Sequence, residues 1–384
     1  MASIGIIGGG QLAAMLVQAV NQVNTETGSG HQVYVLDPNP QCPAVQFGGI
    51  HVQGTPENGE GFSALAELAD GITIDLEDVS VDTLSSVVQQ GVPVVPDPAM
   101  LARVTDKLKQ KQWFEELGLP TAAFSPYDGE QPISAETFGF PVVQKVARGG
   151  YDGRGVAVHN SEADYESRLR APGYLEKFIK RKMEVAVMVA SDGKGDIRAY
   201  EPVEMIFHED GNVLDYLVGP ARLDQATSKQ AQELAISTIT AMQGCGIFGI
   251  EMFLTEQDEL LINEIAPRTH NSGHYTIEAS RTSQFEQQFR ILCGQALGDT
   301  EQLRPAAMFN LLGEPGYGGE TVVEQADEMS ADEDVTVHLY GKAQCFAGRK
   351  MGHVTVTADS VDAAFDKAII MREKILIRGA QKIG

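Results

Sequence analysis

Two glutamates in the segment 246–264 have the spacing of a metal-binding pair. The segment reads GIFGIEMFLTEQDELLINE, and its two apolar runs flank a polar stretch, which predicts an antiparallel hairpin. If Gln257 and Asp258 form a two-residue turn, Glu251 lies directly opposite Glu264, with Cβ atoms about 4.5–5.5 Å apart. Facing carboxylates repel unless a proton or cation lies between them, so the pattern indicates a divalent metal with oxygen ligands, of which Mg²⁺ fits best. A hairpin with both carboxylates in solvent fits the spacing equally well.

Three further segments combine glycine with positive charge, which is scarce in this chain. In RGGYDGRG at 148–155, successive glycines let backbone N–H groups approach phosphate oxygens, and the two arginines add charge. The segment lacks the GKS/T ending of a Walker loop, and an ordinary surface loop is the alternative. The segments 266–274 (APRTHNSGH) and 347–353 (AGRKMGH) also place a cation beside glycine and histidine, as binding of an anionic small molecule requires.

The glycines near the amino terminus point to a different chemistry. Residues 8–13 (GGGQLA) match the G-x-G-x-x-A dinucleotide fingerprint, and Asp37 ends the next apolar run, as a ribose-binding acid does. Taken alone, this pattern favours an NAD-dependent oxidoreductase, although Gly10 and Asp37 are further apart than the usual ~20 residues. The alternative is that these glycines only let a strand pack against a helix.

An α/β scaffold must position these residues. In the first hundred positions, short apolar runs alternate with helix-compatible stretches, which predicts a parallel, doubly wound sheet. Prolines at 96 and 98 suggest a first boundary, and β-branched runs after 304 suggest a small third domain. We therefore expect domains at 1–98, 99–304 and 305–384. The predicted strands are 3–7, 32–36, 71–74, 92–95, 140–146, 174–190, 199–207, 213–218, 336–340 and 352–357, and the predicted helices include 107–117 and 225–242.

Composition argues against several classes of protein. With 29 Lys and Arg against 53 Asp and Glu, the net charge of −24 repels phosphate backbones, so we expect no nucleic-acid partner. The four cysteines lie far apart without a CxxC spacing, which argues against a disulfide framework or structural zinc and fits a reducing cytoplasm. No export signal and no run of about 20 apolar residues occurs, so we expect no membrane partner.

Taken together, the quoted segments resemble the N5-carboxyaminoimidazole ribonucleotide synthetases, an ATP-grasp ligase family of purine biosynthesis. The likeness extends over nearly the whole chain and rests on GIIGGGQL, TDKLKQKQWFEELGLPTA, GGYDGRG, GIFGIEMF followed by NEIAPRTHNSGHYT, TSQFE, and LYGK with AGRKMGH. It implies an ATP-grasp fold of the α/β class (α+β overall). An amino-terminal doubly wound pre-ATP-grasp domain and a small β-rich carboxy-terminal domain belong to that fold, and a homodimer is the family's habit.

The resemblance also implies roles for particular residues. Glu251 and Glu264 match the family's magnesium ligands, and Lys107 and Lys145 match contacts to ATP phosphates. The positions implied around the nucleotide are Lys107, Lys145, the lid-loop residues Gly149, Gly150, Tyr151, Asp152, Gly153, Arg154 and Gly155, then Glu176, Lys177, Phe178 and Ile179 at the adenine edge, Glu184 at the ribose, Asn263 and Glu264. Those implied around aminoimidazole ribonucleotide and the carboxylating centre are Tyr151, Asp152, Arg154, Arg268, His270, Asn271, Lys342, Arg349 and Lys350.

The implied reaction is the ATP-dependent carboxylation of aminoimidazole ribonucleotide with bicarbonate through carboxyphosphate, with ATP and Mg²⁺ as cofactors. Asp152 would accept the amine proton, Lys342 would orient Asp152, and Arg268 would offset charge on the transferring group. Where many family members read YEFEN, this chain has IDLED at 74–78. The alternatives are another ATP-grasp ligase, an NAD-dependent oxidoreductase and a non-catalytic nucleotide-binding regulator.

Overall fold

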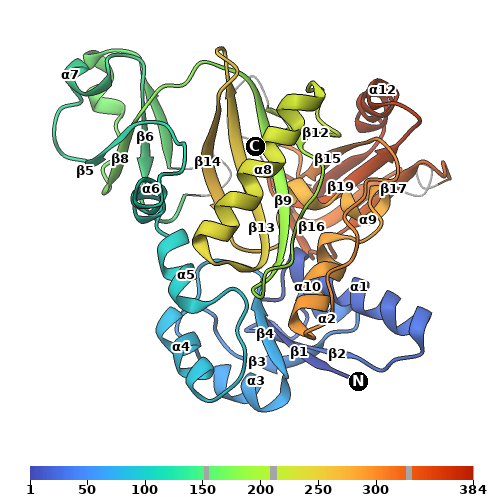
Figure 1. The fold of residues 1–384 in the computed structure, drawn as a ribbon. Coiled ribbons are helices and arrows are strands. Elements are labelled where there is room, and N and C mark those ends of the chain that lie inside the picture. Colours follow the sequence, from blue (N-terminus) through green and yellow to red (C-terminus); the bar gives the residue numbers. More distant parts are fainter. Residues whose placement is uncertain (151–154, 208–213, 326–330, 384) are drawn as a thin grey trace.

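A computed structural model of the chain describes residues 1–150, 155–207, 214–325 and 331–383. It combines one parallel sheet with three antiparallel ones, so the predicted mixture of helices and strands is confirmed. In Figure 1 the amino-terminal region lies below the large sheet, and the small four-stranded sheet lies to its left. Among the described residues, no helix has both the length and the apolar character needed to cross a bilayer.

The amino-terminal region is built on a four-stranded parallel sheet with the order β3-β2-β1-β4. Its central strands are apolar on both faces because helices cover each side. The predicted strand at 92–95 is wrong: Val94 makes only an isolated bridge with Ile72, since Pro93 and Pro96 have no N–H for a ladder. The elements are β1 (Ser3–Ile7), α1 (Gln11–Thr27), β2 (Gln32–Asp37), α2 (Pro43–Gln46), β3 (Ile50–Gln53), α3 (Phe62–Leu68), β4 (Gly71–Ile74) and α4 (Val81–Gln89).

A small antiparallel sheet with the order β5-β8-β6-β7 follows two helices. The predicted helix at 107–117 is confirmed as α6, whose first turn is capped by the Asp106 carboxylate accepting from the Lys109 N–H. The predicted strand at 140–146 is confirmed from Val142 onward. The elements are α5 (Pro98–Val104), α6 (Lys107–Glu116), β5 (Phe124–Tyr127), α7 (Ala135–Phe138), β6 (Val142–Val146), β7 (Val156–His159), the 3₁₀ turn η1 (Glu162–Ser167) and β8 (Gly173–Lys177).

The central strand β9 (Arg181–Asp192) of the large antiparallel sheet is buried on both faces. Along β9, Val187 and Val189 pack beneath α8, while Met188 and Ala190 face α10 on the other side. This alternation explains why the strand reads as a continuous apolar run. The elements are β9 (Arg181–Asp192), β10 (Ile197–Ala199), β11 (Val203–Phe207), β12 (Leu214–Gly219), α8 (Gln225–Met242), β13 (Cys245–Thr255), β14 (Leu260–Ala266), η2 (Asn271–Gly273), α9 (Thr276–Ala279) and α10 (Gln284–Leu292).

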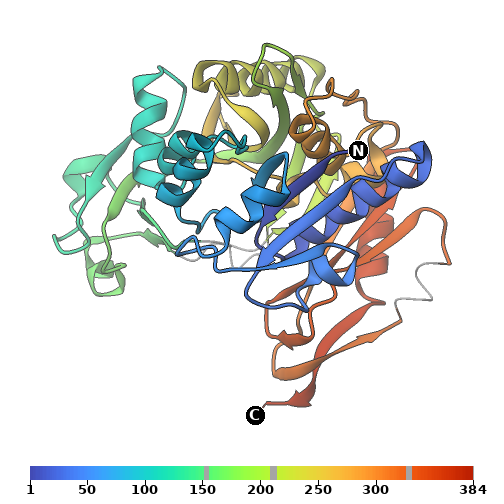
Figure 2. The ribbon, with the colours of Figure 1, turned by 90° about the horizontal axis from the view of Figure 1, so that it is seen from below.

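The carboxy-terminal region continues the large sheet, whose order is β14-β13-β9-β11-β12-β15-β19-β17. Strand β15 pairs with β12, so the sheet crosses the expected boundary at 304–305 without a break, and the domain limits stay a prediction. A separate sheet, β18-β16-β20, extends away from the body in Figure 2. The elements are β15 (Ala306–Leu312), β16 (Tyr317–Glu324), β17 (Val335–Leu339), β18 (Gln344–Phe346), β19 (Lys350–Thr357), α12 (Val361–Arg372) and β20 (Leu376–Lys382).

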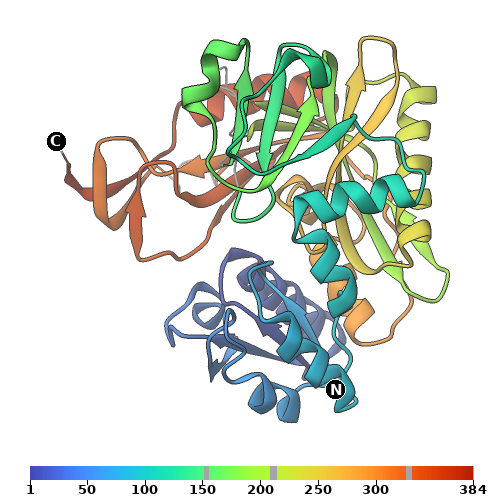
Figure 3. The same cartoon turned by 90° about the vertical axis from the view of Figure 1, so that its left-hand side faces the viewer.

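One apolar core joins the amino-terminal region to the large sheet. Phe285 and Phe289 of α10 pack between Leu16 and Val20 of α1 and Met188 of β9. In Figure 3 the parallel sheet accordingly lies beside the lower end of α10 and of the β13–β14 hairpin. The segment that follows β4 is thereby held against the loop that follows β14, where the candidate site lies.

Candidate active site

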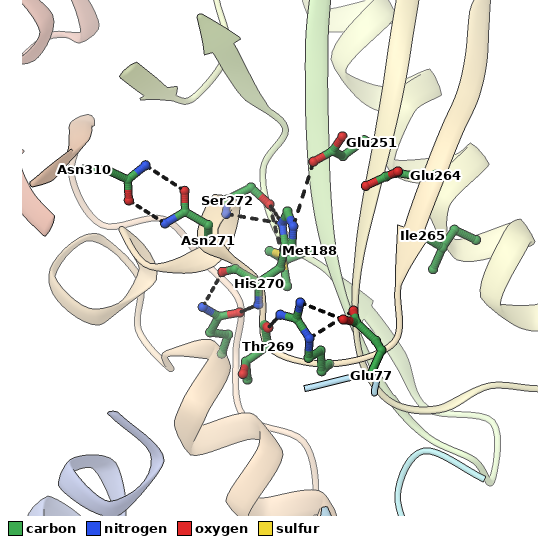
Figure 4. Close-up of polar contacts among 12 residues, drawn as sticks. Glu77, Met188, Glu251, Glu264, Ile265, Thr269, His270, Asn271, Ser272 and Asn310 are labelled. Carbon is green, nitrogen blue, oxygen red and sulfur yellow. Dashed lines mark hydrogen bonds and ion pairs between the residues drawn. The ribbon is translucent and has the colours of Figure 1, made fainter. Parts of the chain in front are cut away.

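The β13–β14 hairpin places Glu251 opposite Glu264, as the sequence predicts. Both carboxylates extend from the same face of neighbouring strands in Figure 4. Their side chains are 15% and 34% exposed, so the alternative with both groups in open solvent does not hold. The two acidic side chains thus share a partly enclosed space in which their exposure to solvent is restricted.

The turn that leads to this pairing differs from the predicted one. Thr255 N–H donates to the Glu259 carbonyl across a three-residue loop, in which Asp258 has a φ of 64°. That loop shifts the next pairs by one position, and a β-bulge with Asn263 as its unpaired residue then restores the expected register at Glu264. The bulge therefore decides which carboxylates meet.

The same bulge directs two consecutive side chains toward lysines. Lys107 forms an ion pair with Glu264, and Lys145 Nζ donates a 2.8 Å hydrogen bond to Asn263 Oδ1. In a regular strand, neighbouring side chains point to opposite faces, so one of these contacts would be lost. The structure therefore brings together the implied phosphate-binding lysines and the implied metal ligands.

The electrostatic surroundings shift the pKa values of the two carboxylates in opposite directions. Burial, together with the charges of Glu264 and Glu184, holds the pKa of Glu251 well above its ordinary value. The Lys107 ammonium instead holds the pKa of Glu264 below its ordinary value. The pair therefore keeps a proton on Glu251 when no cation lies between the carboxylates, and a bound cation would replace that proton.

Lys145 belongs to a buried chain of charges. Its ammonium lies 2.8 Å from Glu176 Oε1, and Lys111 lies 2.8 Å from Glu176 Oε2. The Glu176 side chain is only 3% exposed, and both of its oxygens are engaged by ammonium groups. The implied contact of Glu176 with adenine stays a prediction.

The remaining positions implied around adenine and ribose lie where the small sheet joins the large one. Lys177 ends β8, and Phe178 and Ile179 lie in the connection to β9. Glu184 pairs with Arg181 at 2.5 Å, and burial raises the pKa of the Glu184 carboxyl. This junction lies beside the carboxylate pair, since Glu184 acts electrostatically on Glu251.

The glycine-rich segment is described only at its ends. Gly149 and Gly155 have φ of 75° and 82°, a region that glycine adopts easily. A Cβ on Gly155 would lie 2.4 Å from Val146 Cγ2 and 3.2 Å from Gly150 Cα, so this end of the segment packs tightly against β6. Tyr151, Asp152, Gly153 and Arg154 lie outside the described residues, and their implied roles stay predictions.

Arg268, after β14, meets the segment that follows β4. Its Nε lies 3.0 Å from Glu77 Oε1, and its Nη2 donates to Glu77 Oε2 at 3.1 Å. Glu77 points into the site in Figure 4. Asp75 acts electrostatically on Arg268 and Lys342, and burial raises the pKa of Asp75. Of Asp75 and Glu77 in IDLED, Glu77 is thus the one that forms an ion pair with a residue of the site.

His270 lies between the carboxylate pair and the positions implied around the ribonucleotide. Its Nε2 is 3.9 Å from Glu251 Oε1, and its backbone is held by Gln284, which accepts from its N–H and donates to its carbonyl, both at 2.8 Å. Burial, with the nearby Arg268 charge, lowers the pKa of His270 to about 4. The imidazole is therefore neutral at physiological pH.

Asn271 forms a reciprocal amide pair with Asn310 of β15. Asn271 Nδ2 donates to Asn310 Oδ1 at 2.9 Å, and Asn310 Nδ2 donates back to Asn271 Oδ1 at 3.0 Å. Figure 4 shows the two amides facing one another. The pair uses one N–H and one acceptor position of the Asn271 amide, so half of its hydrogen-bonding capacity is left for a ligand.

Of the implied substrate-binding cations Lys342, Arg349 and Lys350, the two lysines belong to this site. Lys350 acts electrostatically on His270, and Lys342 acts on Asp75. Lys342 Nζ also donates to the Lys350 carbonyl at 2.8 Å. Arg349 is different, because its guanidinium donates to the Gln344 carbonyl at 2.6 Å and packs on Phe346 within its own loop.

His274 and His353, the last residues of the segments 266–274 and 347–353, are not placed to bind an anion. His274 and His353 are 2% and 0% exposed, with ring centroids 4.8 Å apart, and His353 stacks on His338 at 4.4 Å. Tyr340 Oη lies 2.9 Å from His353 Nδ1. These rings connect the loop after β14 to the carboxy-terminal region, so their role is one of packing.

The amino-terminal glycine motif does not form a dinucleotide site. The Asp75 carboxylate accepts from the Gly10 and Ala13 N–H groups, at 2.7 and 3.0 Å, where a pyrophosphate would otherwise bind. Asp37 accepts from the Gly9 N–H at 2.8 Å. A Cβ on Gly10 would lie 2.4 Å from Asp75 Oδ2. The glycines therefore allow close packing, which was the alternative interpretation.

Sequence reasoning missed several residues that support the site. Lys111, Gln284 and Asn310 are 1%, 0% and 5% exposed, although polar residues of these types normally lie at the surface. Lys111 lies within the segment TDKLKQKQWF, which carries part of the family resemblance. That resemblance was the only feature of the sequence that could have marked Lys111. Gln284 and Asn310 lie far along the chain from the loop they hold, and no local pattern marks them.

A metal ion at this site would have two protein carboxylates as ligands. Among the described residues, no group of three or more His, Cys, Asp and Glu side chains has a metal-binding arrangement. Glu251 and Glu264 are nevertheless hard oxygen donors of the kind that Mg²⁺ takes when substrate phosphates and water fill its other positions. The donor set fits a nucleotide-dependent magnesium ion.

Comparisons with known protein families cover most of the chain. Family models described as ribonucleotide synthetase preATP-grasp domain, ATP-grasp domain and phosphoribosylaminoimidazole carboxylase C-terminal domain match residues 1–105, 112–285 and 306–367. The chain is 37% identical to the N5-carboxyaminoimidazole ribonucleotide synthase of Synechococcus elongatus, covering 92% of this chain and 89% of that protein. The corresponding Bacillus subtilis protein is 34% identical, with 92% and 91% covered.

Other relatives extend this likeness. The chain is 36% identical to the Schizosaccharomyces pombe phosphoribosylaminoimidazole carboxylase, covering 93% of this chain but only 65% of that longer protein. The solved structure of N5-carboxyaminoimidazole ribonucleotide synthetase from Thermotoga maritima has a TM-score of 0.88, with 40% identity and 99% and 100% of the two chains covered. An Aspergillus clavatus synthase solved with ADP and aminoimidazole ribonucleotide has a TM-score of 0.85, with 31% identity and 97% and 98% covered. The implied three-part ATP-grasp fold is confirmed.

Proposed function

Because this chain belongs to the N5-carboxyaminoimidazole ribonucleotide synthase family of ATP-grasp enzymes, we propose that it carboxylates 5-aminoimidazole ribonucleotide with bicarbonate at the expense of ATP. Bicarbonate oxygen attacks the γ-phosphorus of ATP, giving carboxyphosphate and ADP. Carboxyphosphate breaks down to CO₂ and phosphate. The exocyclic amine of the ribonucleotide then attacks CO₂ and loses a proton, which yields the N5-carboxylate for purine biosynthesis.

The observation that carries this proposal is that the lysines suited to bind nucleotide phosphates lie next to the groups suited to bind a second anionic substrate. Lys107 and Lys145 lie with the carboxylate pair, as phosphate binding requires, and His270 extends from the next loop to within 3.9 Å of Glu251. Lys350, on β19, acts electrostatically on the same His270. A nucleotide and a second anionic substrate would therefore meet at His270, and a short-lived carboxyl donor would have little distance to travel.

We propose that Glu251 and Glu264 hold Mg²⁺ together with nucleotide phosphate oxygens. The support is the facing register and the pKa of Glu251, which burial and the neighbouring Glu264 charge raise above its ordinary value. A bound magnesium ion would supply neutralisation of the phosphate charge that builds up during phosphoryl transfer. Asn263 lies beside this pair and orients Lys145.

The chain's own residues would bind, orient and exclude water. Lys107 would exchange Glu264 for a phosphate oxygen when the nucleotide binds, and Lys145 would contact the same phosphates. Arg268 would offset charge on the carboxyl group being transferred, and Asp152, oriented by Lys342, would accept the amine proton. Closure of the segment 149–155 would keep carboxyphosphate from water, because an open site loses it to hydrolysis.

The test is a measurement of ADP and of the N-carboxylated product in one assay, omitting ATP, bicarbonate and aminoimidazole ribonucleotide in turn. We expect equal amounts of ADP and product with all three present, and no product when any one is left out. Formate in place of bicarbonate provides the control for a different ATP-grasp ligase. ADP formation that depends on formate and ignores bicarbonate would assign the chain to that other reaction.

We further propose a homodimer that works in the cytoplasm without a nucleic-acid partner. The described cysteines are all free thiols, as a reducing compartment allows, and the net charge of −24 disfavours phosphate polymers. The dimer follows from the family's habit. Sedimentation of the purified chain measures its mass in solution, and a species of one chain's mass at micromolar concentration would contradict the dimer.

A further inference from the structure

Lys111 is a buried cation that the proposed mechanism does not use. It extends from α6, its side chain is 1% exposed, and its ammonium lies 2.8 Å from Glu176 Oε2. Its remaining polar contact is a hydrogen bond to Thr121, whose hydroxyl in turn donates to the Ile262 carbonyl at 2.7 Å. The interior disfavours an isolated charge, so an ammonium held here needs a reason beyond filling space.

The charges around Glu176 do not cancel. Although burial alone would raise it, Lys145 and Lys111 together hold the pKa of Glu176 below its ordinary value, so the carboxylate is ionised. One negative charge thus lies between two positive ones, with Lys111 on one oxygen and Lys145 on the other. The three groups carry one net positive charge. Lys145 is the more exposed of the two lysines, at 11%, and it alone contacts the Asn263 bulge.

We propose that Lys111 is a positioning residue that occupies one oxygen of Glu176 so that the charge of Lys145 stays available to nucleotide phosphates. This inference rests on the proposed ATP-dependent function. Without Lys111, Glu176 would share both oxygens with Lys145 and form a neutral pair. Lys145 would then attract a phosphate less strongly and would be held back from the Asn263 side of the site.

The proposal differs from a role in packing alone. A methionine at position 111 keeps the length and the apolar stem of lysine, so it preserves packing against the Phe124 ring, which the ammonium approaches at 5.5 Å from the centroid. It also leaves Glu176 paired with Lys145, so no buried charge becomes isolated. The variant therefore removes the charge with little change in shape.

The experiment is a calorimetric measurement of ADP binding to Lys111→Met, with Mg²⁺ in excess. We expect the dissociation constant to rise about tenfold, the effect of losing one charge-assisted phosphate contact. Lys109→Met is the matched control, because Lys109 lies exposed on the same helix, and it should bind ADP like the wild type. A Lys111→Met chain with the wild-type dissociation constant would overturn the proposal.

A double-mutant cycle separates electrostatic positioning from structural support. In Glu176→Gln the carboxylate charge is gone, so adding Lys111→Met should change the ADP dissociation constant by less than about twofold. A tenfold loss that persists in the Glu176→Gln background would show a structural role instead. If Lys111→Met alone does not fold, the two Glu176→Gln chains with and without Lys111→Met can still overturn the proposal, because a tenfold difference between them would show a structural role. Failure of the wild type to bind ADP would instead overturn the proposed function itself.

Discussion

The two ends of the candidate site are held together by opposite means. At the carboxylate end (Lys107, Lys145, Glu176, Glu251 and Glu264), Lys107 pairs with Glu264 and Lys145 pairs with Glu176 across strands and helices, while the raised pKa of Glu251 keeps that group protonated. At the amide end (His270, Asn271, Gln284 and Asn310), neutral groups make hydrogen bonds of 2.8–3.0 Å. The pKa of His270, lowered to about 4 by burial, keeps even the titratable member of this end uncharged.

This difference shows how each end would respond to a ligand. Ion pairs such as Lys107–Glu264 can exchange partners with phosphates and a cation, because both ligands bring the charges that the pair would lose. Neutral hydrogen bonds have no such substitute, and breaking them leaves a buried group unsatisfied. The carboxylate end is therefore expected to rearrange on binding, whereas the amide end is expected to stay as it is.

The largest effect should come from neutralising the carboxylate end with Glu264→Gln. This change removes a proposed magnesium ligand and the partner of Lys107, so we expect ADP formation to fall by about three orders of magnitude with the fold intact. The measurement is kcat for ADP formation, with circular dichroism as a check on folding. Glu259→Gln, at the exposed hairpin turn, is the control. Near-normal turnover of Glu264→Gln at modest Mg²⁺ would refute the ligand assignment.

A smaller and more selective effect is expected from the cations that adjoin the amide end. Lys350→Ala should raise KM for aminoimidazole ribonucleotide about tenfold and leave KM for ATP nearly unchanged, because Lys350 acts on His270 rather than on the carboxylates. Arg349→Ala serves as the comparison and should matter less, since the Arg349 guanidinium is held by its own loop. Equal damage to both KM values by Lys350→Ala would indicate a structural role.

Disrupting the amide end itself should cost about a few-fold in the same constant. Asn310→Leu removes both hydrogen bonds that orient Asn271, so we expect KM for the ribonucleotide to rise about threefold to fivefold, together with about 1–3 kcal/mol less stability. Asn310→Asp keeps the acceptor for the Asn271 N–H but turns a second acceptor toward Asn271 Oδ1 and buries a charge, so it should recover none of the loss. If KM for ATP alone changes, the two ends are coupled in a way that contradicts the comparison.

The smallest expected effect concerns how the free energy of unfolding depends on pH. Burial lowers the pKa of His274 and His353 well below 6.5, so these rings are neutral in the folded chain and take up protons on unfolding below pH 6.5. The contribution of these two rings should therefore be flat above pH 6.5 and fall as pH decreases from there, whereas Glu251, whose pKa is raised to about 8, holds a proton in the folded chain over this range and contributes with the opposite sign. Glu264, with its depressed pKa, contributes stability that is lost only below about pH 4.5.

Urea unfolding between pH 7.5 and 5 measures this slope. His353→Phe keeps a ring for the stack on His338 but cannot titrate, so the slope should fall by up to one proton, about 1.4 kcal/mol per pH unit. The loss of the Tyr340 partner lowers stability at every pH alike. An unchanged slope would mean that His353 is already protonated in the folded chain.

Much of the fold and the chemical classes of the site could be predicted from the sequence. Strand 3–7, helix 225–242 and the apolar run of β9 follow from patterns within a few residues, because burial repeats with the period of the backbone. The facing of Glu251 and Glu264 is confirmed, although the three-residue turn and the Asn263 bulge reach it by two departures from the predicted hairpin that compensate each other, and the family resemblance accounts for the lysines beside them.

Only the tertiary structure decided how those residues are used. The Asn263 bulge, the Asp75 carboxylate over the Gly10 N–H, the Asn271–Asn310 pair and the buried Lys111 all join segments that are distant in the chain or depart from a regular period. Local sequence patterns indicate the secondary structure of a segment and which of its faces is buried. The hydrogen-bond and charge partners of a side chain are instead selected by packing across the whole molecule. The sequence by itself therefore determined which chemistry was present, and the three-dimensional packing decided which groups meet, which stay charged and which remain neutral.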